Sequence, residues 1–514
     1  MVKSRVRYSK VDGSSPDFQD ELESVALIKE NSDDEVAIYK QRTSGLAKTT
    51  FTAEEGVEAI GFGLFQIRLY IICGLFTAAD SLEMMLLAVL SPVLRCEWQL
   101  EQFQVAFITT VVFIGMCIMA PVWGFMGDKY GRQTAGVSKA VKLYLFLTLY
   151  MVAIWIGYFG LLTSFSPSYK WILILRGLVG GGMAGSPQAF TLLTEYLPSK
   201  YRAKLLNVTG ISWAFGTMFE IVLASVVIPT LGWRWLMVLS AIPSFLILIL
   251  LKFLPESARY LVAAGREYEA QVVLEKAAKL NRNSLPAGTI TNPPSQSKQG
   301  SPRDLFSRTY CVTTLMVWIL WFGTALSYYG MVLASAEILQ IKNANQSGEK
   351  CKCNLLKKDD YTSMIVSTLG EFIALPLNIF LIDLVGRRWT GAVNLFGCGL
   401  FFILLQLPVP MTVLTGFIFL VRGFSAGMFN FVYIYTSEVY PTTIRTLGIG
   451  AASSWARVGA MVTPFLAQVL LDTSLTAAVW VYGSIGFICA VCAVLLPIET
   501  KGRELPQSVS VEVD

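Results

Sequence analysis

Of the ionisable side chains inside apolar stretches that are long enough to cross a bilayer, five are candidates for a common binding site. They are Asp80, Glu83, Glu220, Glu371 and Arg457. A charge at the centre of a membrane helix costs about 3 kcal/mol, so such residues generally bind, pair or move an ion. We expect all five to line a binding site within the membrane. Asp80 and Glu83 share one helix face, and a structural hydrogen bond is an equally good interpretation of Glu220 and of Glu371.

Aromatic and amide side chains in two further stretches could hold a planar organic solute. Tyr328 and Tyr329 lie in the stretch 310–338, and Asn430 and Tyr433 lie in the stretch 411–435. Aromatic rings stack on a planar group, and amide and hydroxyl groups orient its polar atoms. The sequence contains no His, and its acids do not cluster at metal-binding spacing. We therefore expect no enzyme, no cofactor and no metal site.

The elements that must position these residues are membrane helices. Of the 514 residues, 54% are hydrophobic and only 15% are charged, which is typical of a polytopic membrane protein. Apolar runs of about 20 residues predict an all-α protein with twelve transmembrane helices. The runs cover residues 67–94, 103–126, 143–163, 170–192, 205–228, 233–253, 310–338, 361–382, 389–407, 411–435, 447–471 and 475–496. The net charge of +5 gives no support to a nucleic-acid partner.

Loop charge predicts the orientation of the helices. Basic residues gather in loops on one side, together with the basic central segment, which places both termini in the cytoplasm. The predicted order is a largely disordered tail, a six-helix half, a cytoplasmic loop with short amphipathic helices, a second six-helix half and a short tail. These parts cover residues 1–60, 61–254, 255–309, 310–496 and 497–514.

Four sequence signatures occur twice, in the same order, once in each half. They comprise Gly124, Asp128, Gly131 and Arg132 against Asp383, Gly386 and Arg387; Arg176 against Arg422; Glu195 and Arg202 against Glu438 and Arg445; and Pro255, Glu256 and Ser257 against Pro497, Glu499 and Thr500. The repeat indicates a duplicated six-helix unit with a solute site between the halves. We expect the charged members to form ion pairs at helix ends that hold one conformation and break in another. The alternative is that these charges only fix the orientation of the helices in the membrane. That role would need basic residues and does not explain the acidic residues of both repeats.

The motif GxxxDKYGR from Gly124 resembles the loop motif of the major facilitator superfamily, and PESARY from Pro255 resembles its sugar-porter and organic-ion-transporter branches. The segments EAIGFGLFQ, AADSLEMMLLAVLSP, GWRW and VTPF are most similar to the synaptic-vesicle-two-related proteins, which are allied to organic cation and anion transporters. The resemblance covers residues 57–505. It implies a major facilitator fold, transport by alternating access, and a plasma membrane or synaptic-like vesicle location.

The resemblance also bears on the solute. At the position of Arg457, related organic-ion transporters tend to carry an acid where they move cations and a base where they move anions, which implies a small organic anion here. Neutralisation of Arg457 by one of the acids would instead leave a cation or a zwitterion as solute. Further expectations are a monomer, contact with the lipid bilayer, and protons as a candidate coupling ion. A non-transporting scaffold or receptor on the same fold is the alternative function.

Three local features carry separate expectations. Asn345 begins a glycosylation sequon in the long loop after the seventh span. Cys96 has Cys351 and Cys353 as candidate disulfide partners in loops on the same side. The first half contains extra residues near 136–151 that the second half lacks. They are a tolerated extension of the third span or the product of a splice or gene-model variant.

Overall fold

The computed structural model describes residues 50–132, 144–263, 265–291, 301–347, 356–441 and 444–501. Helices dominate this part of the chain, and each predicted span coincides with one helix or with two or three successive helical segments. The first half contains α3 (Leu64–Trp98), α4 (Gln102–Arg132), α5 (Tyr144–Thr163), α6 (Tyr169–Met183), α7 (Pro187–Glu195), α8 (Ser199–Leu231) and α9 (Trp233–Leu251). The second contains α12 (Cys311–Ser347), α13 (Lys358–Val385), α14 (Arg387–Leu404), α15 (Met411–Val439), α16 (Arg445–Pro464), the π-helical turn η3 (Phe465–Leu470), α17 (Leu471–Thr473) and α18 (Leu475–Leu495).

Within the described residues, nine helices are long and apolar enough to cross a membrane. The remaining three predicted spans correspond to α5, to α6 with α7, and to α14. The expected all-α polytopic membrane fold is therefore confirmed. The longer first half adds no further described helix before α5, whose residues form one continuous helix.

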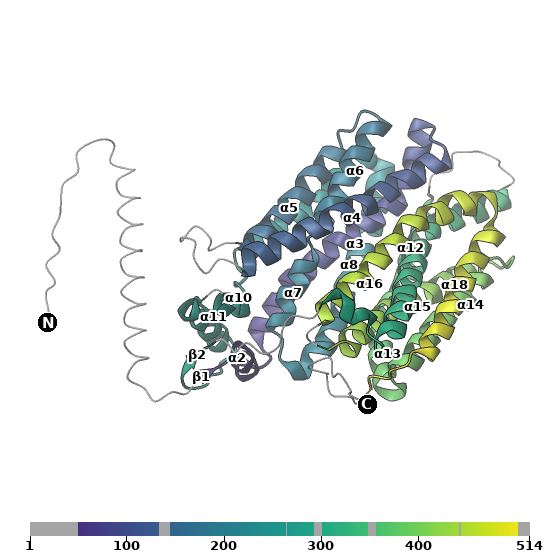
Figure 1. The fold of residues 1–514 in the computed structure, drawn as a ribbon. Helices are drawn as coiled ribbons and strands as arrows, with labels where there is room; N and C mark the ends of the chain where they lie inside the picture. The colour runs from purple at the N-terminus through teal and green to yellow at the C-terminus, as the bar shows by residue number, and fades with distance from the viewer. Residues whose placement is uncertain are drawn as a thin grey trace, which may run out of the picture.

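The two halves are built by the same helix pairings. In the first half α3 packs on α8, α4 on α6, and α5 on both α9 and α6. In the second half α12 packs on α16, α13 on α15, and α14 on both α18 and α15, which are the corresponding pairs. Contacts of α3 with α12, α4 with α16 and α8 with α13 join the halves, which lie side by side in Figure 1.

Glycines permit the closest of these helix crossings. A Cβ atom on Gly180 of α6 would lie 2.0 Å from the Val112 carbonyl oxygen of α4. At the corresponding crossing of the second half, a Cβ atom on Gly370 of α13 would lie 2.3 Å from the Phe419 carbonyl oxygen of α15. Only a residue without a side chain allows two backbones to approach so closely.

The fourth predicted span is not one continuous helix. It breaks between Met183 and Pro187, giving α6 and α7. Pro187 occupies the start of α7, where its missing N–H is tolerated. The eleventh span is also irregular, because α16 ends at Pro464 and continues through η3 and α17. Both irregularities lie in helices that carry candidate site residues or their neighbours.

A small cap of mixed structure covers one end of the first half (Figure 1). It consists of β1 (Thr50–Phe51), α2 (Ala53–Ile60), α10 (Ala258–Ala263), α11 (Glu267–Leu280) and β2 (Thr289–Ile290). The two strands pair in parallel, Thr50 with Thr289 and Phe51 with Ile290. A short 3-10 helix, η2 (Pro302–Phe306), precedes α12. We refer to the two ends of the helix bundle as the cap end and the far end.

The cap corrects one sequence prediction. The tail through residue 60, expected to be largely disordered, is structured from residue 50 onward, where it forms β1 and α2. Phe51, Val57 and Ile60 are buried. Asn281 after α11 accepts a hydrogen bond from the Phe65 backbone N–H at 2.9 Å, which fixes the cap to the start of α3. These partners are more than two hundred residues apart in sequence, so local composition could not reveal them.

Candidate functional site

Each half contains a buried ion pair built on an arginine at the repeated position. In the first half Arg176 of α6 lies 2.8 Å from Glu83 of α3, with side-chain exposures of 1% and 4%. In the second half Arg422 of α15 lies 2.6 Å from Glu371 of α13, with exposures of 2% and 1%. The arginines correspond in the repeat, but their acids come from non-corresponding helices. The structure thus places Arg176 and Arg422 inside the bundle, paired with two of the predicted membrane acids.

Glu220 adds a second carboxylate beside the first of these pairs. It is fully buried on α8 and accepts hydrogen bonds from the Ser240 hydroxyl of α9 at 3.0 and 3.1 Å. It also interacts electrostatically with Glu83 and Arg176. The first half therefore holds two carboxylates around one guanidinium, whereas Glu371 is balanced by Arg422.

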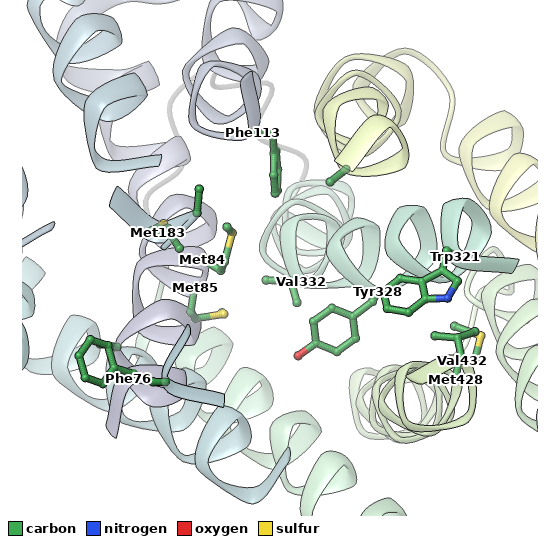
Figure 2. Close-up of a cluster of buried hydrophobic side chains, with 14 of the residues drawn as sticks. Phe76, Met84, Met85, Phe113, Met183, Trp321, Tyr328, Val332, Met428 and Val432 are labelled. Carbon is green, nitrogen blue, oxygen red and sulfur yellow. The ribbon is translucent and has the colours of Figure 1, made fainter. Parts of the chain in front are cut away.

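Tyr328 connects the second ion pair to the opposite half. Its hydroxyl lies 3.2 and 3.3 Å from the two carboxylate oxygens of Glu371 and accepts a hydrogen bond from Nε1 of Trp213 on α8. In Figure 2 the Tyr328 ring projects from α12 into the space between Met84 and Met85 of α3 and Met428 of α15. The buried side chain therefore bridges α8 of the first half to α13 of the second.

A second group of predicted residues gathers around Tyr329. This half-buried side chain interacts electrostatically with Asp80, Tyr433 and Arg457, which come from α3, α15 and α16. Its ring lies 5.2 Å from the ring of Phe113 on α4. Both halves of the molecule therefore contribute to this group, which we call the central site.

Among the described residues, the ionisable side chains Asp80 and Arg457 of the central site have no ionic partner. Arg457 is half-buried, and no described carboxylate forms an ion pair with it. Asp80 is also half-buried and accepts a hydrogen bond from the Ser186 hydroxyl at 2.8 Å, at the break between α6 and α7. Opposite halves thus contribute an acid and a base to the central site, and neither has a described ionic partner.

Two neighbouring side chains of α15 complete the second-half wall. Tyr433 is 47% exposed, packs edge-on against Trp321 with a centroid distance of 4.5 Å, and interacts electrostatically with Arg457. The Nδ2 atom of Asn430 is buried and has no hydrogen-bond partner among the described residues. A bound solute could accept a hydrogen bond from this amide and pack against the exposed ring of Tyr433.

At the cap end, the repeated charges of the second half are joined by hydrogen bonds. Arg387 donates two hydrogen bonds of 2.8 Å to Glu438, and Thr500 donates one of 2.6 Å to the same carboxylate. Glu499 accepts from the backbone N–H groups of Arg387 and Arg388 at 3.0 and 3.1 Å, which caps the start of α14. Gly386 adopts a φ of 91° at the turn, and Asp383 precedes it at the end of α13. Arg445 donates to the Tyr440 carbonyl oxygen at 3.3 Å.

The corresponding acids of the first half are less fully satisfied. Glu195 interacts with the Ser257 hydroxyl, as Glu438 does with Thr500, but its buried Oε2 atom has no hydrogen-bond partner in the part of the chain that the structure describes. The Oε1 atom of Glu256 is likewise orphaned. Burial raises the pKa of Glu256 from 4.5 to about 7, and burial also raises the pKa of Glu195.

Several predicted residues fall where only the backbone is described. Gly124, Asp128, Gly131 and Arg132 lie in the last turns of α4, and Arg202 lies in the first turn of α8. Asn345 lies in the last turn of α12, so this part of the expected loop is helical. Both candidate disulfide partners of Cys96 lie outside the described residues.

A polar contact between the halves at the far end was missed from the sequence. Arg95 of α3 lies 3.4 Å from Glu337 and 3.2 Å from Gln340, both on α12. Gln468 of η3 donates to the Ser91 hydroxyl of α3 at 2.9 Å. Glu337 could have been found, because it is a further acid within the seventh apolar run. Among the described residues, no group of three or more potential ligands could hold a metal ion.

Comparisons with known proteins agree with this architecture. The profile of the family described as sugar (and other) transporter matches residues 88–509. The human protein named putative transporter SVOPL is 43% identical over 474 residues, covering 89% of this chain and 94% of its own. The Xenopus laevis synaptic vesicle 2-related protein is 44% identical over 499 residues, covering 95% and 87%.

Solved structures show the same fold at low identity. The xylose transporter XylE from E. coli, in a partially occluded inward open conformation, gives a TM-score of 0.66 at 16% identity, covering 86% of this chain and 100% of that chain. A D-xylose-proton symporter gives a TM-score of 0.63 at 16% identity, covering 85% and 99%. The family and its relatives are transporters, not enzymes. The chain belongs to the sugar (and other) transporter family of the major facilitator superfamily, within its synaptic vesicle 2-related group.

Proposed function

We propose that the protein is a secondary transporter or uniporter that moves a small organic anion by alternating access, with Arg457 as the counter-ion of the solute. The observation that carries the proposal is that Arg457 has no ionic partner among the described residues. A half-buried guanidinium within a membrane helix is costly when unpaired, so an anion from outside the protein would stabilise it.

Three of the membrane acids already bind other side chains of the protein, which favours an anionic solute over a cationic one. Glu83 pairs with Arg176, Glu371 pairs with Arg422, and Glu220 is held by Ser240. None of them neutralises Arg457. A carboxylate of the solute could accept two parallel hydrogen bonds from the guanidinium, while Tyr329 and Tyr433 contact its ring.

The distribution of contacts between the halves supports a rocking movement. Arg95 with Glu337, and Gln468 with Ser91, hold α3 against the second half near the far end. Discrete polar contacts of this kind can break in one conformation and form in another. We infer that the repeated charges at the cap end, from Asp128 and Arg132 to Glu438 and Arg445, serve as the opposing gate.

A coupling proton fits the charge of the first-half cluster. With all groups ionised, Glu83, Glu220 and Arg176 carry one net negative charge in a dry environment, and binding of one proton would neutralise it. The related symporter carries protons according to its name, and we extend that coupling ion to this protein only as part of the proposal.

The location follows from the relatives and from loop charge. We infer a monomer in a vesicle membrane or the plasma membrane, because relatives are named for synaptic vesicles. The cap and both termini then lie in the cytoplasm, and Asn345 carries glycan on the opposite side.

Uptake into proteoliposomes tests the proposal. Purified protein is offered matched aromatic carboxylates and aromatic amines, with and without a pH gradient. We expect carboxylates to compete better, Arg457→Ala to abolish their uptake, and Arg457→Lys to weaken their binding despite keeping the charge. Arg234→Ala is the matched control, because Arg234 is 49% exposed at the far end. Better competition by amines, or unchanged uptake by Arg457→Ala, would refute the anion site. Absence of uptake of any solute would favour the scaffold function.

A further inference from the structure

Asp80 is a second charged group of the central site, and the binding of an anion does not use it. It lies on α3 one turn before Glu83, but the two carboxylates have different surroundings. Glu83 is buried and paired with Arg176, whereas Asp80 is half-buried and hydrogen-bonded only to the Ser186 hydroxyl. No described cation forms an ion pair with Asp80. The site therefore presents an acidic pole at Asp80 and a basic pole at Arg457, and neither is paired with a described charge.

The two poles belong to different halves of the molecule and share Tyr329 as a neighbour. Asp80 belongs to the first half and Arg457 to the second, and Tyr329 interacts electrostatically with both. Opposite charges in a poorly hydrated site attract strongly, yet these two do not form an ion pair. A solute with a single carboxylate would neutralise Arg457 and leave Asp80 as an uncompensated charge beside the bound anion.

We propose that the solute carries a protonated amine in addition to its anionic group, and that Asp80 binds the amine while Arg457 binds the anion. The solute class is then a zwitterionic aromatic amino-carboxylate. This inference rests on the proposed function, since it uses the same site and the same role for Arg457, and it replaces the simple anion with a zwitterion whose carboxylate Arg457 binds.

The surroundings of the poles fit such a molecule. Phe113 of α4 and Tyr329 of α12 lie 5.2 Å apart and provide aromatic surface from both halves. The orphaned Nδ2 atom of Asn430 offers one further hydrogen bond to an acceptor on the solute. A solute with one charge binds only one half through an ionic contact, whereas a zwitterion binds both. Closure of the halves around the solute would therefore select the zwitterion.

Protonation of Asp80 is the competing account, because a proton would also neutralise its charge during uptake of a simple anion. The two accounts differ in what Asp80→Asn does. Asparagine has nearly the same shape and can keep the hydrogen bond with Ser186, but it can neither be charged nor take up a proton. If Asp80 binds an amine, only amine-bearing solutes depend on the carboxylate. If Asp80 carries a proton, uptake of the simple anion depends on it as well.

The experiment compares three solutes with one aromatic body: 3-phenylpropionate, 2-phenylethylamine and phenylalanine. Wild type should take up phenylalanine with the highest affinity. Asp80→Asn should lower the preference for phenylalanine over 3-phenylpropionate at least about tenfold, because only phenylalanine carries the amine that the carboxylate binds. Asp80→Glu, which keeps the charge but displaces it, should keep the preference for phenylalanine with lower affinity. Equal thermal midpoints of the purified variants establish that each one is folded.

Three results would overturn the inference. In the first, wild type binds 3-phenylpropionate as tightly as phenylalanine. In the second, Asp80→Asn loses both the uptake of 3-phenylpropionate and the dependence of that uptake on pH. In the third, Asp80→Asn binds phenylalanine as tightly as wild type does. In each of these cases an anion transporter that depends on Arg457 would survive. Failure of the proposed function itself is distinguishable, because Arg457→Ala would then leave the uptake of all three solutes unchanged.

Discussion

Replacement of Glu371 by glutamine should destabilise the protein far more than loss of a surface ion pair. Glu371 and Arg422 are 1% and 2% exposed, so the substitution leaves a guanidinium buried without a counter-ion. Removal of one partner from a buried pair costs about 3–5 kcal/mol. The amide oxygen of glutamine can still accept a hydrogen bond from Arg422, so we expect a loss near the lower value. The exposed pair of Arg234 and Glu97, at 49% and 37% exposure, should contribute roughly 0–1 kcal/mol.

Thermal unfolding in detergent measures this difference through the buried thiols of Cys398 and Cys489, which a thiol-reactive dye reaches only on unfolding. Glu371→Gln should lower the midpoint clearly, whereas Arg234→Gln, the matched control, should leave it nearly unchanged. The double variant Glu371→Gln with Arg422→Gln should recover part of the loss, because it removes the unpaired charge. Equal midpoints for Glu371→Gln and Arg234→Gln would refute the argument that burial determines the strength of the pair.

Two further predictions concern helix packing and the cap. Gly180→Val should abolish folded protein at the cell surface, because its Cβ atom would lie 2.0 Å from the Val112 carbonyl oxygen, whereas Gly416→Val, with nothing within 4 Å, should be expressed normally. Equal surface levels would contradict the close crossing. Because the pKa of Glu256 is raised from 4.5 to about 7, its contribution to stability is present at low pH and is lost as pH rises through that interval. Glu256→Gln should therefore show a smaller decrease in thermal midpoint between about pH 4.5 and pH 7 than wild type, and an unchanged decrease would show that Glu256 does not titrate there.

The architecture could be predicted from the sequence because it depends on signals that are local or repeated. Apolar length is sufficient to locate a membrane helix, and the twelve runs agree with the observed helices. The order of the repeated motifs indicated a duplicated unit, and the two halves indeed use corresponding helix pairs. Charge within an apolar run was likewise enough to identify Asp80, Glu83 and Arg457 as unusual residues.

Partner choice could not be predicted, because it depends on contacts between distant helices. Asp80 and Glu83 share a helix face, yet one faces Ser186 and the other Arg176. The sequence associated Arg176 and Arg422 with the loop charges, since both belong to the repeated motifs. Their burial follows from the depth of α6 and α15 in the bundle, which no local pattern encodes. The same limit applies to the cap, where Asn281 contacts the start of α3.

The halves repeat their helix packing but not their distribution of charge, and this asymmetry indicates which half can respond to a solute or a proton. In the second half Glu371 is neutralised by Arg422, and Glu438 is neutralised by Arg387. In the first half Glu220 lies beside an ion pair that is already complete, and Asp80 faces the central site without a cation. An acid can respond to a ligand only when the protein has not already neutralised it, so the responsive acids are concentrated in the first half. Trp213 of that half donates to Tyr328, whose hydroxyl contacts Glu371, so a shift of α8 would alter the environment of the second ion pair through a single hydroxyl group.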